Sequence, residues 1–328
     1  MRTPELSVVV PVYGCTNCLR PLFERLSRTL EDEGVDWEVV FVDDDSPDNS
    51  WPLLEQLAEA DQHVRALHLS RNFGQHAAIT AGLQESRGRW VIVMDCDLQD
   101  PPEEIPKLLA RAREGYDIVL TKRDRSRQRW LRRVAGRLYF RIRNSLLKTQ
   151  VDPDFSTLSL ISRPVVDAFL RMGDRDRQYM LILHWLGFRR TVLELSFSDR
   201  YEGHSSYTLS KLIRVGLDGM FFQTTVLLRW IIYVGFTVAL AGMGLAVTLV
   251  TLYFVNRPPA GYTSLAVLIL LVGGFIIMST GVAGLYVGKI FEQVKGRPLY
   301  VVDRRAGQPP DAAETTLNAE HGEPLRSP

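Results

Sequence analysis

Two carboxylates, Asp95 and Asp97, stand one residue apart directly after the apolar run 90–94. The residues at 98–103 have the composition of a turn that leads into a helix. Hard carboxylate oxygens at the end of a buried strand suit Mg²⁺ or Mn²⁺, and such an ion suits a diphosphate. An Asp-x-Asp pair also occurs in solvated turns, where an aspartate caps the next helix. The apolar run in front of this pair favours the metal site.

Two further carboxylates, Asp43 and Asp44, follow the strand-like run 37–42, which is apolar apart from Glu38. Carboxylates in this position can accept hydrogen bonds from a base or a ribose. The chain has no Gly-x-Gly-x-x-Gly after its first apolar run and no Gly-x4-Gly-Lys-Ser/Thr. The absence of both motifs argues against a dinucleotide dehydrogenase and a P-loop enzyme. Carboxylates suited to a metal and a nucleoside therefore indicate an enzyme that uses a nucleotide sugar.

The elements that must position these carboxylates alternate regularly along the first part of the chain. Strand signals occur at 6–12, 37–42, 64–69, 90–94 and 117–121, and helical periodicity occurs between them at 19–33, 50–60, 74–86 and 102–115. This alternation predicts an α/β domain, at 1–225, with a mostly parallel sheet that helices cover on both faces. Ligands bind such sheets beyond the carboxyl ends of the strands, where all four aspartates lie.

Two runs without a charged residue follow, at 230–255 and 262–287, each of 26 residues. A membrane span needs about 20 residues, so the pair predicts a transmembrane hairpin at 226–290. A buried hairpin in a soluble protein is the alternative. Lys and Arg gather on the side that carries both termini, so the positive-inside rule places the large domain and the 291–328 tail in the cytoplasm, at the inner membrane. The polar residues after Arg304 are expected to be disordered.

A basic segment precedes the hairpin. Between Lys122 and Lys148 there are eleven Lys or Arg and one acid, Asp124. The part at 127–147 has an apolar stripe with arginines around it, which predicts a helix lying in the membrane interface. A second such helix is expected at 209–222. A surface helix packed on the sheet is the alternative for the first of them.

Composition adds few constraints. The 328 residues carry a net charge of +1, which gives no reason to expect a nucleic acid partner. The three cysteines, Cys15, Cys18 and Cys96, are few and odd in number, which predicts a reducing compartment and no disulfide framework. Cys15 and Cys18 form a Cys-x-x-Cys, but redox or metal chemistry is not favoured without a second pair. No signal peptide is visible at the start of the chain.

Several segments together resemble family-2 glycosyltransferases with the GT-A fold. They are VVVPVY at 8–13, VDDDSPD at 42–48, NFGQHAA at 72–78, DCDLQDPPE at 95–103, DF at 154–155, RYEGHSSY at 200–207 and GLYVGKIF at 284–291. The likeness extends over about 5–302 and is greatest to polyprenyl-phosphate glycosyltransferases of the dolichol-phosphate-mannose-synthase type, which have two membrane spans. Within that group, RNFGQHAA at 71–78 is similar to the undecaprenyl-phosphate 4-deoxy-4-formamido-L-arabinose transferases.

The resemblance implies an inverting transfer of a sugar from a nucleotide diphosphate to a polyprenyl phosphate, such as undecaprenyl phosphate. The product would be a lipid-linked monosaccharide for modification of cell-envelope glycans. It implies Mg²⁺ or Mn²⁺ as cofactor and a lipid bilayer as surroundings. The two spans and the interfacial helices are compatible with a homotetramer, as similar enzymes suggest. The sequence itself does not determine the oligomeric state.

The resemblance also assigns roles to single residues. Asp95 and Asp97 match the metal ligands, with Gln99 as a further candidate, and Asp97 also belongs to the catalytic group. Pro11, Tyr13, Asp43, Asp44, Asp95, Arg200 and Ser205 match positions that bind the nucleotide sugar. Arg123 matches an arginine that holds phosphate, Arg137 is the expected second one with Arg133 and Arg141 as alternatives, and Asp154 matches an acidic residue of the catalytic site.

Three positions depart from the family pattern. Gly14-Cys15 stands where many relatives have Asn-Glu, Asp45 stands where the second motif usually has Gly, and Ser206 replaces a lysine of the expected diphosphate site. Arg200 is present, and Lys211 lies one turn further along the expected helix.

Two other functions compete with the polyprenyl-phosphate transferase. A processive polysaccharide synthase would need Gln-x-x-Arg-Trp, whereas 128–130 reads Gln-Arg-Trp, and two spans make no obvious pore. An inactive membrane scaffold that binds a nucleotide sugar is the other alternative, and the intact Asp95 and Asp97 argue against it. Metal-dependent transfer or hydrolysis of nucleotide sugars would separate these functions.

Overall fold

The computed structural model describes residues 3–123, 155–175, 177–195 and 262–307, together with a few single positions between 233 and 251. The described residues fall into two compact units. The first contains a β-sheet and the helices packed on it, and the second contains the long helix α10 (Tyr262–Val294). Each unit is described by itself below.

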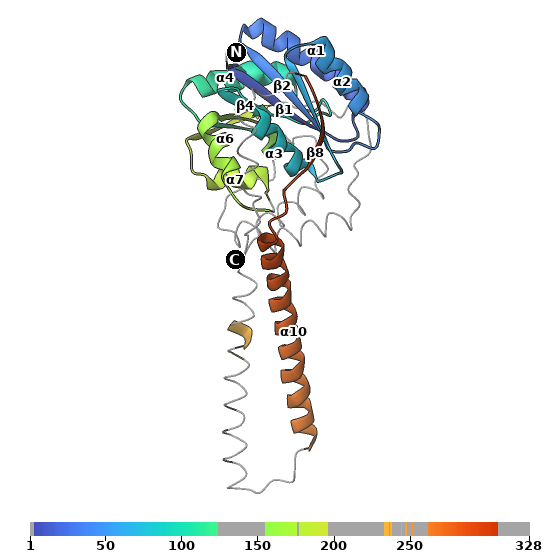
Figure 1. Ribbon diagram of the computed structural model, residues 1–328. Coiled ribbons are helices and arrows are strands. Elements are labelled where there is room, and N and C mark those ends of the chain that lie inside the picture. The colour runs from blue at the N-terminus through green and yellow to red at the C-terminus, as the bar shows by residue number, and fades with distance from the viewer. Residues whose placement is uncertain are drawn as a thin grey trace, which may run out of the picture. The chain divides into compact units, whose positions relative to one another are not determined.

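One mixed sheet of eight strands forms the frame of the first unit, in the order β7-β5-β6-β4-β1-β2-β3-β8 (Figure 1). The strands are β1 (Leu6–Val12), β2 (Trp37–Asp43), β3 (Val64–Leu69), β4 (Trp90–Val93), β5 (Ile118–Arg123), β6 (Phe155–Ser162), β7 (Arg190–Leu195) and β8 (Val302–Ala306). β6 is antiparallel to β4 and β5, β8 is antiparallel to β3, and the remaining pairs are parallel. The predicted α/β class with a mostly parallel sheet is therefore confirmed.

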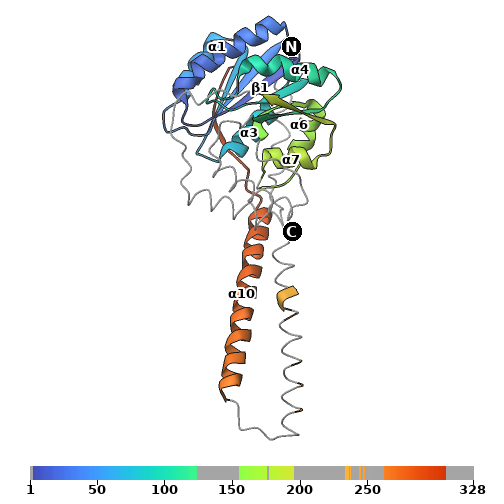
Figure 2. The same ribbon diagram turned by 180° about the vertical axis from the view of Figure 1, so that it is seen from behind.

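Helices cover both faces of this sheet (Figures 1 and 2). They are α1 (Thr16–Glu33), α2 (Trp51–Ala60), α3 (Gln75–Glu85), a 3₁₀ turn (Pro102–Glu104) continued by α4 (Ile105–Arg113), α6 (Arg163–Leu170) and α7 (Tyr179–Trp185). One apolar cluster joins the sheet to α1, α2 and α4, and a second cluster joins the opposite face to α3, α6 and α7. Strand β1 is buried along its whole length because successive residues enter these two clusters in turn.

The register of the central strands brings the predicted site residues to one edge of the sheet. β1 pairs with β2 so that Val12 lies beside Asp43, and it pairs with β4 so that Val9 lies beside Val93. Beyond the end of β4, the N–H of Met94 still donates to the carbonyl of Val9, 3.1 Å away. The chain segments after β1, β2 and β4 therefore leave the sheet next to one another.

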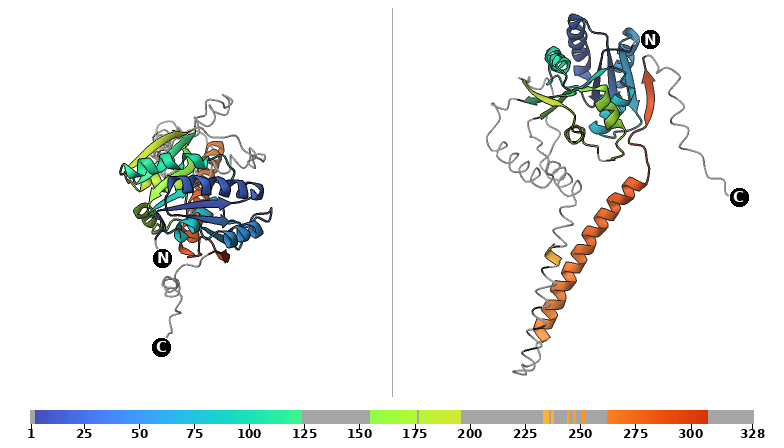
Figure 3. Two further views of the ribbon diagram at one scale, coloured as in Figure 1. Left: turned by 90° about the horizontal axis from the view of Figure 1, so that it is seen from above. Right: turned by 90° about the vertical axis from the view of Figure 1, so that its left-hand side faces the viewer.

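Strands β6, β7 and β8 are not among the predicted elements. β8 lies along the edge of the sheet beside β3 (Figure 3). The expectation of disorder after Arg304 is wrong at its beginning, because β8 continues to Ala306. Pairing with the exposed edge of β3 supplies backbone hydrogen bonds that a polar tail cannot make alone, and Arg305 adds an ion pair with Glu85.

The predicted membrane elements are described only in part. The expected span at 262–287 lies within α10, whereas most of 230–255 and both expected interfacial helices, 127–147 and 209–222, lie outside the described residues. In the portion of the chain that the structure describes, no helix has the length and apolar character that a membrane crossing requires.

Candidate active site at the carboxyl ends of the central strands

The segment after β4 alternates between half-buried and buried residues. Asp95, Asp97 and Gln99 are half-buried, whereas the intervening Cys96, Leu98 and Asp100 are buried, with exposures of 8%, 5% and 0%. Leu98 has a φ of 60°, in the left-handed region that few side chains adopt. The alternation gives the three predicted metal ligands the more accessible positions of this segment.

The buried carboxylate of Asp100 holds this segment in place through hydrogen bonds. The backbone N–H of Asp95 donates to Oδ2 of Asp100 over 3.2 Å, and the hydroxyl of Ser156 in β6 donates to Oδ1 of Asp100 over 3.1 Å. Asp100 therefore links the candidate ligand segment to the neighbouring strand. Sequence reasoning missed this residue. The only signal in the sequence was its spacing of two residues from Leu98 and four from Cys96, which places it with the buried residues of this segment.

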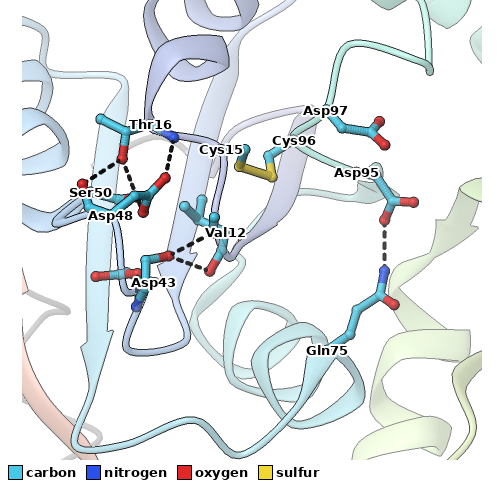
Figure 4. The surroundings of a disulfide bond; sticks show 12 residues. Val12, Cys15, Thr16, Asp43, Asp48, Ser50, Gln75, Asp95, Cys96 and Asp97 are labelled. Carbon is cyan, nitrogen blue, oxygen red and sulfur yellow. Dashed lines mark hydrogen bonds between the residues drawn. A yellow bond between two sulfur atoms is a disulfide. The ribbon is translucent and has the colours of Figure 1, made fainter. Parts of the chain in front are cut away.

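The carboxylate of Asp95 is oriented from another element. Gln75, the first residue of α3, donates a side-chain hydrogen bond from Nε2 to Oδ1 of Asp95 at 2.7 Å (Figure 4). On Asp97, Oδ1 accepts the backbone N–H of Gln99 at 3.1 Å. Figure 4 shows both carboxylates on the same side of the loop that carries them. The NFGQHAA segment thus contributes to the site through Gln75, a role the sequence had not indicated.

The donor set in this segment fits a hard divalent cation. Two carboxylates and the side-chain carbonyl of Gln99 supply oxygen ligands only. Among the described positions, no group of three His, Cys, Asp or Glu residues is arranged to hold a metal. Mg²⁺ is commonly held by one or two carboxylates, with water and substrate phosphates completing its shell. Asp95 and Asp97 are therefore the residues that would hold such an ion, and Gln99 stays a candidate.

Asp43 and Tyr13 lie at the ends of β2 and β1. Asp43 is 1% exposed, and its Oδ1 accepts the backbone N–H of Ser46 at 3.1 Å while Oδ2 faces Nδ1 of His68 at 2.9 Å. Tyr13 is 53% exposed, so its ring is accessible to a planar ligand, and Pro11 is buried within β1. The structure places these three residues at one edge of the sheet, and their contacts with a base stay a prediction.

Aromatic and basic side chains continue the contacts that begin at His68, the partner of Asp43. The ring of Trp51 lies 5.4 Å from that of His68, and the guanidinium of Arg304 lies 5.4 Å over the Trp51 ring. Sequence reasoning missed His68, Trp51 and Arg304. Arg304 comes from β8, and nothing in its local sequence indicates that it returns to the first strands.

Asp44 is a structural anchor in this arrangement. Its two oxygens accept the backbone N–H groups of Phe73 and Gly74 at 2.7 and 2.8 Å. Burial raises the pKa of the Asp44 carboxyl, although these two hydrogen bonds act in the opposite direction. Asp44 thereby fixes the loop before α3, and its expected contact with a nucleotide stays a prediction. Its neighbour Asp45, at a position where the resemblance leads us to expect glycine, has a φ of 54°, a conformation that glycine adopts more readily than aspartate.

A disulfide joins Cys15 to Cys96, so the expectation of no disulfide is wrong (Figure 4). The partners are 81 positions apart, but each lies three residues beyond the end of its strand, β1 or β4, and these strands are paired. The count and spacing of the cysteines in the sequence do not indicate that β1 and β4 are paired, and this pairing is what brings the two cysteines together. Cys18, the second half of the Cys-x-x-Cys, is buried in α1 and is not part of the disulfide.

The remaining predicted residues are less fully placed. Arg123 is the last residue of β5, which runs in the same direction as β4, so its backbone lies at the same edge of the sheet. The other predicted positions lie outside the described residues: Asp154, Arg133, Arg137, Arg141, Arg200, Ser205, Ser206 and Lys211.

Comparisons with known proteins identify the family of this chain. The model of the family described as "Glycosyl transferase family 2" matches residues 7–170. The chain is 34% identical over 303 residues to an uncharacterized glycosyltransferase of Synechocystis sp., covering 92% of this chain and 95% of that protein. It is 35% identical over 309 residues to the undecaprenyl-phosphate 4-deoxy-4-formamido-L-arabinose transferase of Proteus mirabilis, covering 92% and 94%.

Among solved structures, the mannosyltransferase PcManGT of Pyrobaculum calidifontis, in complex with GDP-Man and Mn²⁺, aligns with 90% of this chain and 89% of its own. The TM-score is 0.46 at 16% identity.

Proposed function

Because the chain belongs to glycosyl transferase family 2 and is a glycosyltransferase, we propose that it transfers a sugar from a nucleotide diphosphate to a polyprenyl phosphate. The transfer inverts the anomeric centre, depends on Mg²⁺ or Mn²⁺, and yields a lipid-linked monosaccharide for cell-envelope glycans. The observation that carries the proposal is the pair Asp95 and Asp97, set beyond β4 in the half-buried positions of a segment that Asp100 holds in place. The identity of 35% to a transferase named for undecaprenyl phosphate supports the choice of acceptor.

The chemistry of this reaction matches what the residues offer. A phosphate acceptor is already anionic at neutral pH, so it needs little help from a general base. The barrier lies in bringing two anions together and stabilising the diphosphate that leaves. A bound divalent ion would supply Lewis-acid stabilisation of that diphosphate. Asp95 and Asp97 would hold the ion, while Asp43 and Tyr13 would bind and orient the nucleoside.

The basic residues complete this proposal. Arg123 and Arg137 would bind phosphate groups, Arg200 and Ser205 would bind the donor diphosphate, and Asp154 would act among the catalytic residues. Planar guanidinium groups suit phosphate because they form two parallel hydrogen bonds. The proposal gives Ser206 no role, because it lacks the charge of the lysine usual at this position.

The acceptor also requires a location. We place the protein at the cytoplasmic face of the inner membrane, with a hairpin at 226–290 and interfacial helices at 127–147 and 209–222. The support comes from two charge-free runs and the concentration of Lys and Arg on one side of them. This arrangement keeps the site close to the headgroup of a lipid phosphate.

A transfer assay tests the proposal. Purified full-length protein is incubated with Mn²⁺ or Mg²⁺, undecaprenyl phosphate and a panel of UDP- and dTDP-sugars, and lipid products are identified by mass. One donor should yield a lipid-linked monosaccharide. Asp97→Ala should reduce its formation by at least a hundredfold, whereas Asp32→Ala, at an exposed position of α1, should leave it unchanged.

Two results would count against the proposal. Activity that survives both Asp97→Ala and a chelator would remove the metal from the mechanism. A polymer instead of a monosaccharide product would identify a processive synthase.

A further inference from the structure

The Cys15–Cys96 disulfide lies inside the candidate site. Cys96 is the residue between Asp95 and Asp97, and Cys15 immediately precedes α1, two residues after Tyr13. In Figure 4 the disulfide lies between Val12 and Asp43 on one side and the two carboxylates on the other. It is therefore a covalent connection between the region proposed for the nucleoside and the region proposed for the metal.

The disulfide restrains the backbone of the candidate ligands. Cys15 and Cys96 are 9% and 8% exposed, so both halves of the disulfide are largely buried. A buried Cys96 side chain keeps its neighbours Asp95 and Asp97 in the more accessible positions of the segment. The other restraints on this segment are non-covalent, such as the hydrogen bonds to Asp100 and from Gln75. The S–S bond is thus the one covalent restraint, and reduction removes it.

We propose that Cys15 and Cys96 form a reversible thiol–disulfide modification site that controls how firmly the Asp95–Asp97 segment is held, and thereby the affinity for a metal–nucleotide donor. This inference rests on the proposed function for its ligand, but not for its effect on the segment. The disulfide form is the preorganised, tighter-binding form, because less conformational freedom is lost on binding.

The reaction is an exchange with a dithiol or a disulfide compound. In reduction, one sulfur of a dithiol attacks the Cys15–Cys96 bond, forms a mixed disulfide and releases one protein thiol. The second sulfur of the dithiol then closes its own disulfide and releases the other protein thiol. Two electrons and two protons pass from the dithiol to the protein. Oxidation by a small-molecule disulfide reverses the exchange and leaves two small thiols.

The proposed location makes such a site responsive. On the cytoplasmic side thiols are kept reduced, and the disulfides that do form there are usually transient and redox-sensing. A disulfide built into the site would therefore appear under oxidising conditions and be lost when they end. Cys18, one helical turn from Cys15, is not part of the disulfide and offers a matched control.

Hydrogen exchange and metal binding on the full-length protein test the inference. The disulfide form should show one alkylatable thiol after unfolding, and the form treated with dithiothreitol should show three. Reduction should accelerate amide exchange in the peptide that covers 94–100 at least fivefold, and should weaken the binding of Mn²⁺ with UDP three- to tenfold. Cys96→Ser should resemble the reduced form and not respond to dithiothreitol, whereas Cys18→Ser should respond as the wild type does.

The outcomes separate this inference from the proposed function. If exchange in 94–100 is the same in both forms, the disulfide does not control the segment and the inference is wrong. If reduction accelerates amide exchange in 94–100 but Mn²⁺ and UDP bind equally to both forms, the proposal that the disulfide controls donor binding is wrong. If neither form binds a metal or transfers a sugar while exchange still responds, the proposed function fails and control of the segment stands.

Discussion

The backbone N–H of Asp95 donates to the carboxylate of Asp100, which is 0% exposed and lies five residues further along the chain. A second bond, from the hydroxyl of Ser156, fixes the same carboxylate to β6. The candidate metal ligands are therefore held through a buried acid that would not itself touch the ion. A residue of this kind affects metal affinity by orienting the ligands. Its removal commonly lowers metal affinity or activity ten- to a hundredfold.

We expect Asp100→Ala to lower the free energy of unfolding by about 1–3 kcal/mol, because the amide of Asp95 loses its partner in a buried place. The transfer activity should fall roughly ten- to a hundredfold at subsaturating metal and recover partly at high Mn²⁺. Denaturant unfolding and metal titrations of activity measure these effects. Ser156→Ala is the matched control, since it leaves the hydrogen bond between Asp95 and Asp100 in place. It should lower the free energy of unfolding and the transfer activity less than Asp100→Ala does. Activity of Asp100→Ala equal to wild type at low metal would contradict this role.

The bond from Gln75 to Asp95 leads to a second prediction. Gln75→Glu places a second negative charge beside Asp95, at a position where the amide now donates over 2.7 Å. We expect the concentration of Mn²⁺ needed for half-maximal activity to change at least threefold, and the rate to fall, because the carboxylate loses its orienting donor. Gln75→Ala should also lower the rate. Gln56→Ala, at an exposed position of α2, should match wild type in the same titration.

Asp48 gives stability a dependence on pH. Its carboxylate accepts the backbone N–H of Thr16 and the hydroxyl of Ser50, both at 2.8 Å. Burial raises the pKa of Asp48, but these hydrogen bonds outweigh it, and the pKa is lowered from the ordinary 3.8. A lowered pKa in the folded state means that the stabilisation is present above pH 3.8 and is lost as the pH falls toward the folded-state value.

Asp48→Asn should therefore flatten the acid side of the stability profile. Because Asp48 is exposed, the effect should be small, roughly 0.5–1 kcal/mol above pH 5, and should shrink below pH 3.8. Urea unfolding between pH 3 and pH 7 measures it. A difference between variant and wild type that grows toward low pH would have the wrong sign for this mechanism.

The disulfide should also stabilise the folded protein. Cys15 and Cys96 are 81 positions apart, and cross-linking a loop of this length is worth up to about 4.5 kcal/mol through the entropy of the unfolded chain. Reduction by dithiothreitol should thus lower the midpoint of thermal unfolding by several degrees. The Cys96→Ser variant should melt at the reduced value under both conditions, and Cys18→Ser should keep the response. An unchanged midpoint on reduction would show that the bond adds nothing to stability.

The sequence was sufficient for the elements that local patterns encode. Short runs rich in apolar residues predict β1, β2, β3, β4 and β5. The leucines at 19, 22, 26 and 30 predict α1, since they repeat with the helical period on one face. The position of aspartates after such strands placed Asp43 and Asp95 at one edge of the sheet. That inference holds because parallel strands end at the same edge, whichever order they take.

Strand order and side-chain pairing were decided only by the tertiary structure. β6 and β8 enter the sheet antiparallel, and nothing in their local pattern states which strand they pair with. The partners of the site residues depend on that order. Ser156 reaches Asp100 because β6 lies beside β4, and Arg304 reaches Trp51 because β8 lies beside β3.

The cysteines show the division most clearly. The sequence determined that a thiol stands between Asp95 and Asp97, and that another follows Tyr13. It predicted no disulfide, because the count alone favours separate thiols. Only the pairing of β1 with β4 brings Cys15 to Cys96. A contact across 81 positions depends on how distant strands pack, and local preferences of the chain do not record that packing.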